Sequence, residues 1–167
     1  MLIAKITSGG QTGADRAALD VAIELGIPHG GWIPKGRKTE RGPLPTKYKL
    51  QEMPTDSYPK RTEKNVIDSD GTLIISHGEL SGGSDFTRMM AEKHGKPWIH
   101  VDANRVSVEA ATEIIRAWLN GNDIEILNVA GPRASKDRKI YTTMGKARRL
   151  LAPSPKWLVE EGTIPAA

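Results

Sequence analysis

The sequence decides its fold in the stretch Leu2-Ile3-Ala4-Lys5-Ile6-Thr7-Ser8-Gly9-Gly10-Gln11-Thr12-Gly13-Ala14-Asp15. Its apolar start predicts a strand over 2–6, and the apolar spacing that follows predicts a helix over 16–25. Glycines between a strand and a helix let the backbone turn tightly and approach a ligand closely. Because free N–H groups at a helix N-terminus attract anions, this loop is a candidate phosphate cradle.

A purely structural interpretation of the same loop stays open. The loop is neither a G-x-G-x-x-G fingerprint nor a Walker loop, since no G-K-[ST] closes it. Thr12 or Asp15 could act only as a helix cap in a tight turn.

The rest of the chain alternates strand-like and helix-like segments. Strands are predicted over 30–33, 72–76, 97–101 and 124–130. Helices are predicted over 62–69 and 108–119, from the turn 82–85 to about 94, and from the turn 131–135 to near 151. This alternation predicts an α/β fold, a Rossmann-like three-layer sandwich with an open, mainly parallel sheet of about five strands. Residues 1–152 form the expected Rossmann-like ligand-binding domain, and 153–167 a C-terminal tail that packs on it or extends from it.

A long segment over 34–60 separates the second expected strand from the next helix. It is rich in proline and glycine, and loops of this length in a compact domain are usually functional or disordered. Its charged residues and tyrosines favour a functional role over disorder.

Three of the expected strands end in glycine-bearing turns. Since the carboxyl ends of parallel strands share one edge, these turns are expected to meet there and to form a small-ligand site. Lys35, Arg37, Arg61 and Arg133 are the candidate anion clamps, although Arg133 could instead cap a helix or pair with Asp137. The candidate ligand-binding or phosphate-binding residues are Gly9, Gly10, Gln11, Thr12, Gly13, Asp15, Lys35, Arg37, Arg61, Asn65, Gly82, Gly83, Ser84, Asp85, Thr87, Gly131, Arg133 and Ser135.

Composition narrows the function classes. The chain has 167 residues with no cysteine, which excludes disulfides, thiolate metal ligands and cysteine nucleophiles, and its four scattered histidines predict no protein-built metal site.

No apolar run is long enough to cross a membrane and no signal-peptide pattern is present, so a cytoplasmic location is expected. A net charge of +4 suits a small anionic ligand or a polyanion. The few aromatic residues do not alternate with the basic ones, which argues against nucleic acid.

Seven motifs carry a family resemblance that runs from about residue 5 to 151. The motifs are Ser8 to Asp20, Gly31 to Arg37, Tyr48-x-Leu50-x-Glu52, Arg61-Thr62-Glu63-x-Asn65-Val66, Asp70 to Ile74, Gly82-Gly83-Ser84-x-x-Thr87 and Leu127 to Arg133-x-Ser135. With these motifs the chain resembles the molybdenum cofactor carrier family, which is similar to the lysine-decarboxylase-like LOG proteins in a Rossmann-like superfamily.

The resemblance implies a Rossmann-like fold, homo-oligomerisation, and binding of the molybdenum cofactor (molybdopterin) or a related phosphorylated pterin or nucleotide. Molybdoenzymes or cofactor-synthesis enzymes are the implied protein partners. The LOG phosphoribohydrolases use a P-G-G-x-G-T-x-x-E loop. The comparable stretch here, Ser81 to Arg88, lacks that catalytic glutamate and has Arg88 near its place.

Two functions therefore stay open. A carrier would hold the ligand by its phosphate and pterin edges without chemistry. A nucleotide-processing enzyme, LOG-like or a phosphohydrolase or transferase, would need acid–base groups, for which the candidates are Asp15, Glu40, Glu52, Glu63 and Asp85.

Overall fold

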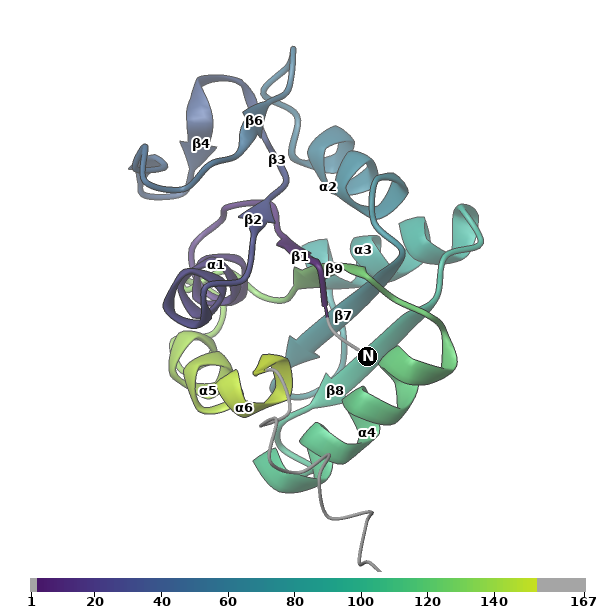
Figure 1. Cartoon of the computed structure of the whole chain (residues 1–167). Helices are drawn as coiled ribbons and strands as arrows, with labels where there is room; N and C mark the ends of the chain where they lie inside the picture. Colours follow the sequence, from purple (N-terminus) through teal and green to yellow (C-terminus); the bar gives the residue numbers. More distant parts are fainter. Residues whose placement is uncertain (1–2, 153–167) are drawn as a thin grey trace, which may run out of the picture.

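The computed structural model describes residues 3–152 and contains a five-stranded sheet in which every neighbouring pair is parallel (Figure 1). The order is β2-β1-β9-β7-β8. These strands are β1 (Lys5–Thr7), β2 (His29–Gly30), β7 (Gly71–Ser76), β8 (Trp98–Asp102) and β9 (Ile126–Ala130). The predicted α/β fold with about five parallel strands is confirmed.

Helices cover both faces of the sheet and bury its apolar side chains. One layer contains α1 (Ala14–Leu25), α4 (Val108–Gly121), α5 (Ile140–Lys146) and α6 (Arg148–Leu151), and the other contains α2 (Tyr58–Ile67) and α3 (Gly82–Lys93). The first layer packs on strand residues such as Ile6, Leu73 and Leu127, which are fully or almost fully buried. After β1 the chain adds β2 on one side of the sheet, and after β7 it adds β8 on the other side. The strand order therefore reverses between β1 and β7, where β9 lies.

The predicted strand over 30–33 is divided between two sheets. Gly31 has φ +125°, a conformation that favours glycine, and a Cβ there would lie 2.2 Å from the Ser8 carbonyl oxygen. Beyond this break, β3 (Trp32–Ile33) pairs in parallel with β6 (Gln51–Glu52), away from the main sheet. A single uninterrupted strand was therefore wrong.

The 34–56 segment is an ordered projection rather than a bare loop (Figure 1, top left). It contains the 3₁₀ turn Lys35–Arg37, the antiparallel pair β4 (Lys38–Thr39) and β5 (Gly42–Pro43), and β6. Its core is Ile33, Leu44, Tyr48 and Leu50, packed against Leu19 of α1. The Arg37 guanidinium donates to the carbonyl oxygens of Leu44, Pro45, Tyr48 and Leu50 at 2.8–3.4 Å.

Two predicted helix starts were wrong. The helix expected from residue 62 begins at Tyr58, because the Ser57 hydroxyl caps it by accepting from the Lys60 N–H, with Pro59 in the first turn. The turn after β9 does not lead directly into a helix. The N–H groups of Lys136 and Asp137 both bond the Arg133 carbonyl, and α5 begins only at Ile140.

The expected tail over 153–167 lies outside the described residues. Across residues 3–152, none of the helices combines the length and apolar character needed to cross a membrane.

Candidate functional site

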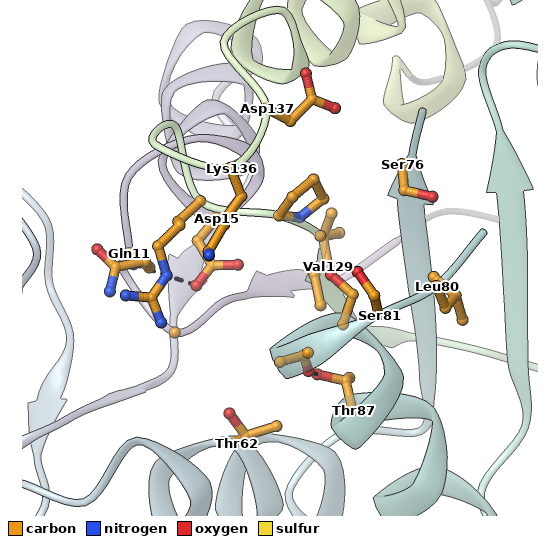
Figure 2. Close-up of a pocket in the computed structure, with 18 of the residues that line it drawn as sticks. Gln11, Asp15, Thr62, Ser76, Leu80, Ser81, Thr87, Val129, Lys136 and Asp137 are labelled. Atoms are coloured by element: carbon orange, nitrogen blue, oxygen red, sulfur yellow. Dashed lines mark hydrogen bonds between the residues drawn. The ribbon is translucent and has the colours of Figure 1, made fainter. Parts of the chain in front are cut away.

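A cavity of about 800 Å³ opens at the carboxyl ends of β1, β7 and β9, where the strand order reverses. This is the edge at which open α/β sheets bind ligands. Its walls come from the β1 loop, α2, the start of α3 and the segment after β9. Gln11, Asp15 and Lys136 lie on one side of it, across from Ser81, Leu80 and Thr87 (Figure 2).

The β1 loop and α2 meet at a buried ion pair. The Arg61 guanidinium donates to the Gly9 carbonyl oxygen, and its Nη1 lies 3.4 Å from Oδ2 of Asp15. A Cβ on Gly9 would lie 1.8 Å from the same nitrogen, so glycine is required for this approach. The N–H of Gln11 also donates to Asp15 Oδ2, at 3.2 Å.

Burial sets the protonation of this pair. It raises the pKa of Asp15 to about 6, against the opposing effects of Arg61 and of the Gln11 and Gly9 N–H groups. Burial also lowers the pKa of Arg61, although Asp15 opposes it. Asp15 is therefore a cavity-lining carboxyl that takes up a proton just below neutral pH.

Gln11 lines the cavity, and its amide is held by the main chain. Its Oε1 accepts from the N–H groups of Thr12 at 3.0 Å and Glu40 at 2.9 Å, which fixes the orientation of the amide. Its Nε2 is buried and has no hydrogen-bond partner among residues 3–152. An unpaired buried donor costs stability, so this amide is a local weak point of the β1 loop.

The N-terminus of α3 forms the opposite wall. Ser81 is the N-cap, but its side chain makes no capping hydrogen bond within the described chain. Gly82 has φ +52°, and a Cβ on Gly83 would meet nothing within 4 Å. Internal packing therefore does not account for the glycine at 83, whereas close approach of a ligand to this backbone would.

Basic side chains outnumber acidic ones around the cavity. Arg61, Arg133, Lys136, Arg138 and Lys139 face Asp15, Glu79 and Asp137. The guanidinium groups of Arg61 and Arg133 both lie 5.5 Å from the centroid of the Tyr58 ring. These two cations are thus held close together at a site with a net positive lining.

Most of the predicted site residues lie at the cavity. They are Gly9, Gln11, Asp15, Arg61, Asn65, Gly82, Gly83, Ser84, Thr87, Gly131 and Arg133. Asn65 also has a structural task, because its amide bonds both the N–H and the carbonyl of Trp32, at 2.8 and 3.0 Å.

The structure does not bring four predicted residues to either cavity described here. The Arg37 guanidinium donates its hydrogen bonds to carbonyl oxygens of the 34–56 segment, and Lys35 lies exposed in the same turn. Asp85 pairs with Arg88 at 2.7 Å. A Cβ on Gly10 would meet Leu44, Leu50 and Ile33, so this glycine admits the core of the projection.

The other three predicted residues, Thr12, Gly13 and Ser135, line a second, neighbouring cavity. Thr12 and Ser135 both donate hydroxyl hydrogen bonds to Glu40. Burial disfavours the ionised carboxylate, but these bonds outweigh it and lower the pKa of Glu40. Glu40 therefore fastens the projection to two loops of the main domain and is poorly suited as a general base.

Two further candidate carboxylates, Glu52 and Glu63, form contacts away from the cavity. Glu52 accepts from the Gly36 N–H at 2.7 Å, and Glu63 pairs with Lys93 and His94. Of the five candidate acid–base groups, Asp15 is the one that lines the cavity.

Sequence reasoning missed several lining residues, among them Thr62, Ser76, His77, Asn128, Lys136 and Asp137. His77 Nδ1 lies 2.6 Å from Asp137 Oδ2 and its Nε2 lies 3.0 Å from the Thr143 hydroxyl, which ties the end of β7 to the segment after β9. Ser76 and His77 lie at the end of β7, and Asn128, Lys136 and Asp137 lie in or after β9. Their position near the carboxyl ends of predicted strands was the available signal. Within residues 3–152 no cluster of three or more His, Asp or Glu side chains is suited to hold a metal.

Fold and cavity together define a Rossmann-like α/β protein with a basic cavity at the switch point of its sheet. The model of the circularly permutated YpsA SLOG family matches residues 6–151, and the chain belongs to that family.

A crystal structure of a "Putative molybdenum carrier protein" from Syntrophus aciditrophicus is 56% identical, with a TM-score of 0.89 over 90% of this chain and 96% of that one. These findings confirm the predicted family. Human Matrix-remodeling-associated protein 5 is 25% identical over 147 residues, and the match covers 85% of this chain but 5% of the human protein.

Proposed function

We propose that the chain is a binding protein that holds the molybdenum cofactor, or a related phosphorylated pterin or nucleotide, in the cavity at the switch point. The observation that carries the proposal is the gathering of Arg61, Arg133 and the uncapped start of α3 around one cavity. All of these groups are donors or cations, and a phosphate supplies the acceptors they lack. The solved relative named a molybdenum carrier adds support.

The residues fit this cargo by its phosphate and not by its metal. With no cysteine in the chain, no thiolate can ligate molybdenum, so the dithiolene of the cofactor itself would keep the metal. The N–H groups at 82–84 would donate hydrogen bonds to the phosphate oxygens, and Arg133 would neutralise their charge. The side of the cavity formed by Leu80 and Val129 offers apolar surface for a flat ring.

Isothermal titration calorimetry tests the proposal with three probes: molybdenum cofactor, neopterin monophosphate and GMP. We expect saturable binding of at least one of them. Removing one charged contact from a buried phosphate should weaken it about 10- to 50-fold, so Arg133→Ala should lose that much affinity. Arg105→Ala is the charge-matched control, because Arg105 is exposed and lines neither cavity. If none of the three probes binds, the proposal is wrong.

A nucleotide-processing enzyme is the second candidate, and one observation favours it. Asp15 is a buried carboxyl at the cavity with a pKa of about 6, which suits a group that donates and accepts a proton near neutral pH. The test is a panel of nucleotides followed by chromatography for released base or phosphate. Turnover that disappears in Asp15→Asn would support this function over the carrier.

Homo-oligomerisation and contacts with molybdoenzymes or cofactor-synthesis enzymes stay predictions from the family resemblance. Light scattering on the purified chain, with and without the bound probe, tests the first of them directly.

A further inference from the structure

A second cavity, of about 710 Å³, adjoins the first across a thin wall. The wall is the contact between the β1 loop and the segment after β9, where the Ala14 N–H donates to the Pro132 carbonyl at 3.2 Å and the Ala134 N–H to the Thr12 hydroxyl at 3.1 Å. Arg138 lines both cavities. A ligand that passes over this wall would therefore keep contact with one arginine throughout.

Three arginines line the second cavity: Arg16, Arg41 and Arg138. Within residues 3–152, no carboxylate lies within ion-pair distance of any of them, and Nε of Arg16 is buried without a hydrogen-bond partner. The carboxylate of the cavity, Asp20, already accepts from the hydroxyls of Tyr48 at 2.6 Å and Tyr141 at 2.5 Å. Three arginines against one carboxylate leave the cavity with excess positive charge, and a bound anion would balance it.

The same cavity presents an aromatic surface. Tyr141 is 46% exposed, and its hydroxyl bond to Asp20 holds the ring in place. That bond, together with burial, raises the pKa of Tyr141 to about 12, so the hydroxyl stays protonated and the ring uncharged. An exposed, fixed aromatic ring beside cationic side chains is suited to stacking with a nucleobase next to its phosphate.

We propose that the second cavity binds the nucleotide end of a dinucleotide-type ligand, whose other phosphorylated half occupies the first cavity and whose diphosphate link passes beside Arg138. The inference rests on the proposed function of the first cavity and extends it. It makes the preferred cargo a pterin or nucleotide joined through a diphosphate to a second nucleoside, rather than a simple monophosphate.

The experiment compares two probes by calorimetry: GMP, and diguanosine diphosphate, in which two GMP units are joined through their phosphates. The longer probe should bind about tenfold tighter or more, since it adds charged hydrogen bonds and one stacked base. Arg41→Ala and Tyr141→Leu should each remove most of that advantage and leave GMP affinity unchanged. Tyr141→Phe keeps the ring but loses its hydrogen bond to Asp20, so it should retain part of the advantage. Arg105→Ala should change the affinity of neither probe.

Each outcome separates this inference from the proposed function. Equal affinity for the two probes, or equal losses for both in Arg41→Ala, overturns the second subsite while the first cavity stands. The same conclusion follows if neither guanosine probe binds but neopterin monophosphate does. If no phosphorylated pterin or nucleotide binds at all, both proposals are wrong. Arg41 is exposed, so its variant is expected to fold, and thermal melting checks this.

Discussion

Two arginines in two regions of the molecule, Arg37 in the 34–56 projection and Arg61 at the cavity, look equivalent in the sequence and do different work in the structure. The Arg37 guanidinium is saturated by four carbonyl oxygens of its own segment. Arg61 contacts Gly9 and Asp15, and its Nε has no partner within the described residues. The comparison teaches that a basic residue indicates an anion site only when the fold leaves its donors unused.

Arg37→Ala is the substitution with the largest expected effect, and it tests whether Arg37 is a structural residue. The substitution leaves several largely buried carbonyls without a donor, so the free energy of unfolding should fall by about 3 kcal/mol. Affinity for the phosphorylated probe should stay within a factor of about two, as expected for a distant surface change. Lys35→Ala, in the same turn, is the matched control and should change the stability by less than about 0.5 kcal/mol. Urea denaturation and calorimetry measure the two quantities, and a large loss of affinity with unchanged stability would contradict our assignment of Arg37.

Asp15 provides a sharper test at the cavity, through pH. Its folded-state pKa of about 6 is above the ordinary value of 3.8, so between these values the native state binds more protons than the unfolded state. The contribution of Asp15 to stability is therefore fully present below pH 3.8 and is lost as the pH rises through about 6. Ionised Asp15 also repels a bound anion.

We accordingly expect GMP affinity to fall about three- to tenfold from pH 5 to pH 7.5, because a tenfold change corresponds to about 1.4 kcal/mol of repulsion. Asp15→Asn keeps an acceptor for the Gln11 N–H and should remove most of this dependence. An unchanged pH profile in that variant would show that another group, such as the phosphate of GMP with its second ionisation at about pH 6, carries it.

The smallest expected effect separates Gly83 from Gly9. Because a Cβ on Gly83 meets nothing within 4 Å, Gly83→Ala should fold and gain up to about 1 kcal/mol from the helix preference of alanine. If a phosphate approaches this backbone, affinity should fall about threefold, or by about 0.6 kcal/mol. Gly9→Ala, whose Cβ would collide with Arg61, should lose stability instead. Unchanged affinity in Gly83→Ala would mean that the ligand does not contact the start of α3.

Much of the sheet could be predicted from the sequence because apolar runs between turns mark several of its strands. The burial of all six residues of Gly71–Ser76 is the clearest case. The start of α2 could not, because the Ser57 cap and Pro59 lie in a segment whose composition resembles a loop. The break at Gly31 depends on its contact with Ser8, which is invisible along the chain.

The part of the candidate site formed by glycine turns after strands could be predicted from the sequence. The part that depends on contacts between residues far apart in the chain could not. Gly9, Gly83 and Arg133 were identified from their place after a strand or before a helix. The free Nε2 of Gln11 depends on Glu40, 29 residues away, taking up the other end of the amide. Likewise, only the fold reveals that Glu40 serves Thr12 and Ser135 rather than the cavity.

A crystal structure with a phosphorylated pterin or GMP at saturating concentration tests the central claim most directly. We predict phosphate density bounded by the guanidinium of Arg133 and the N–H groups at the start of α3. Phosphate density elsewhere on the chain, with Arg133 and Gly83 contacting no ligand atom, would contradict the account.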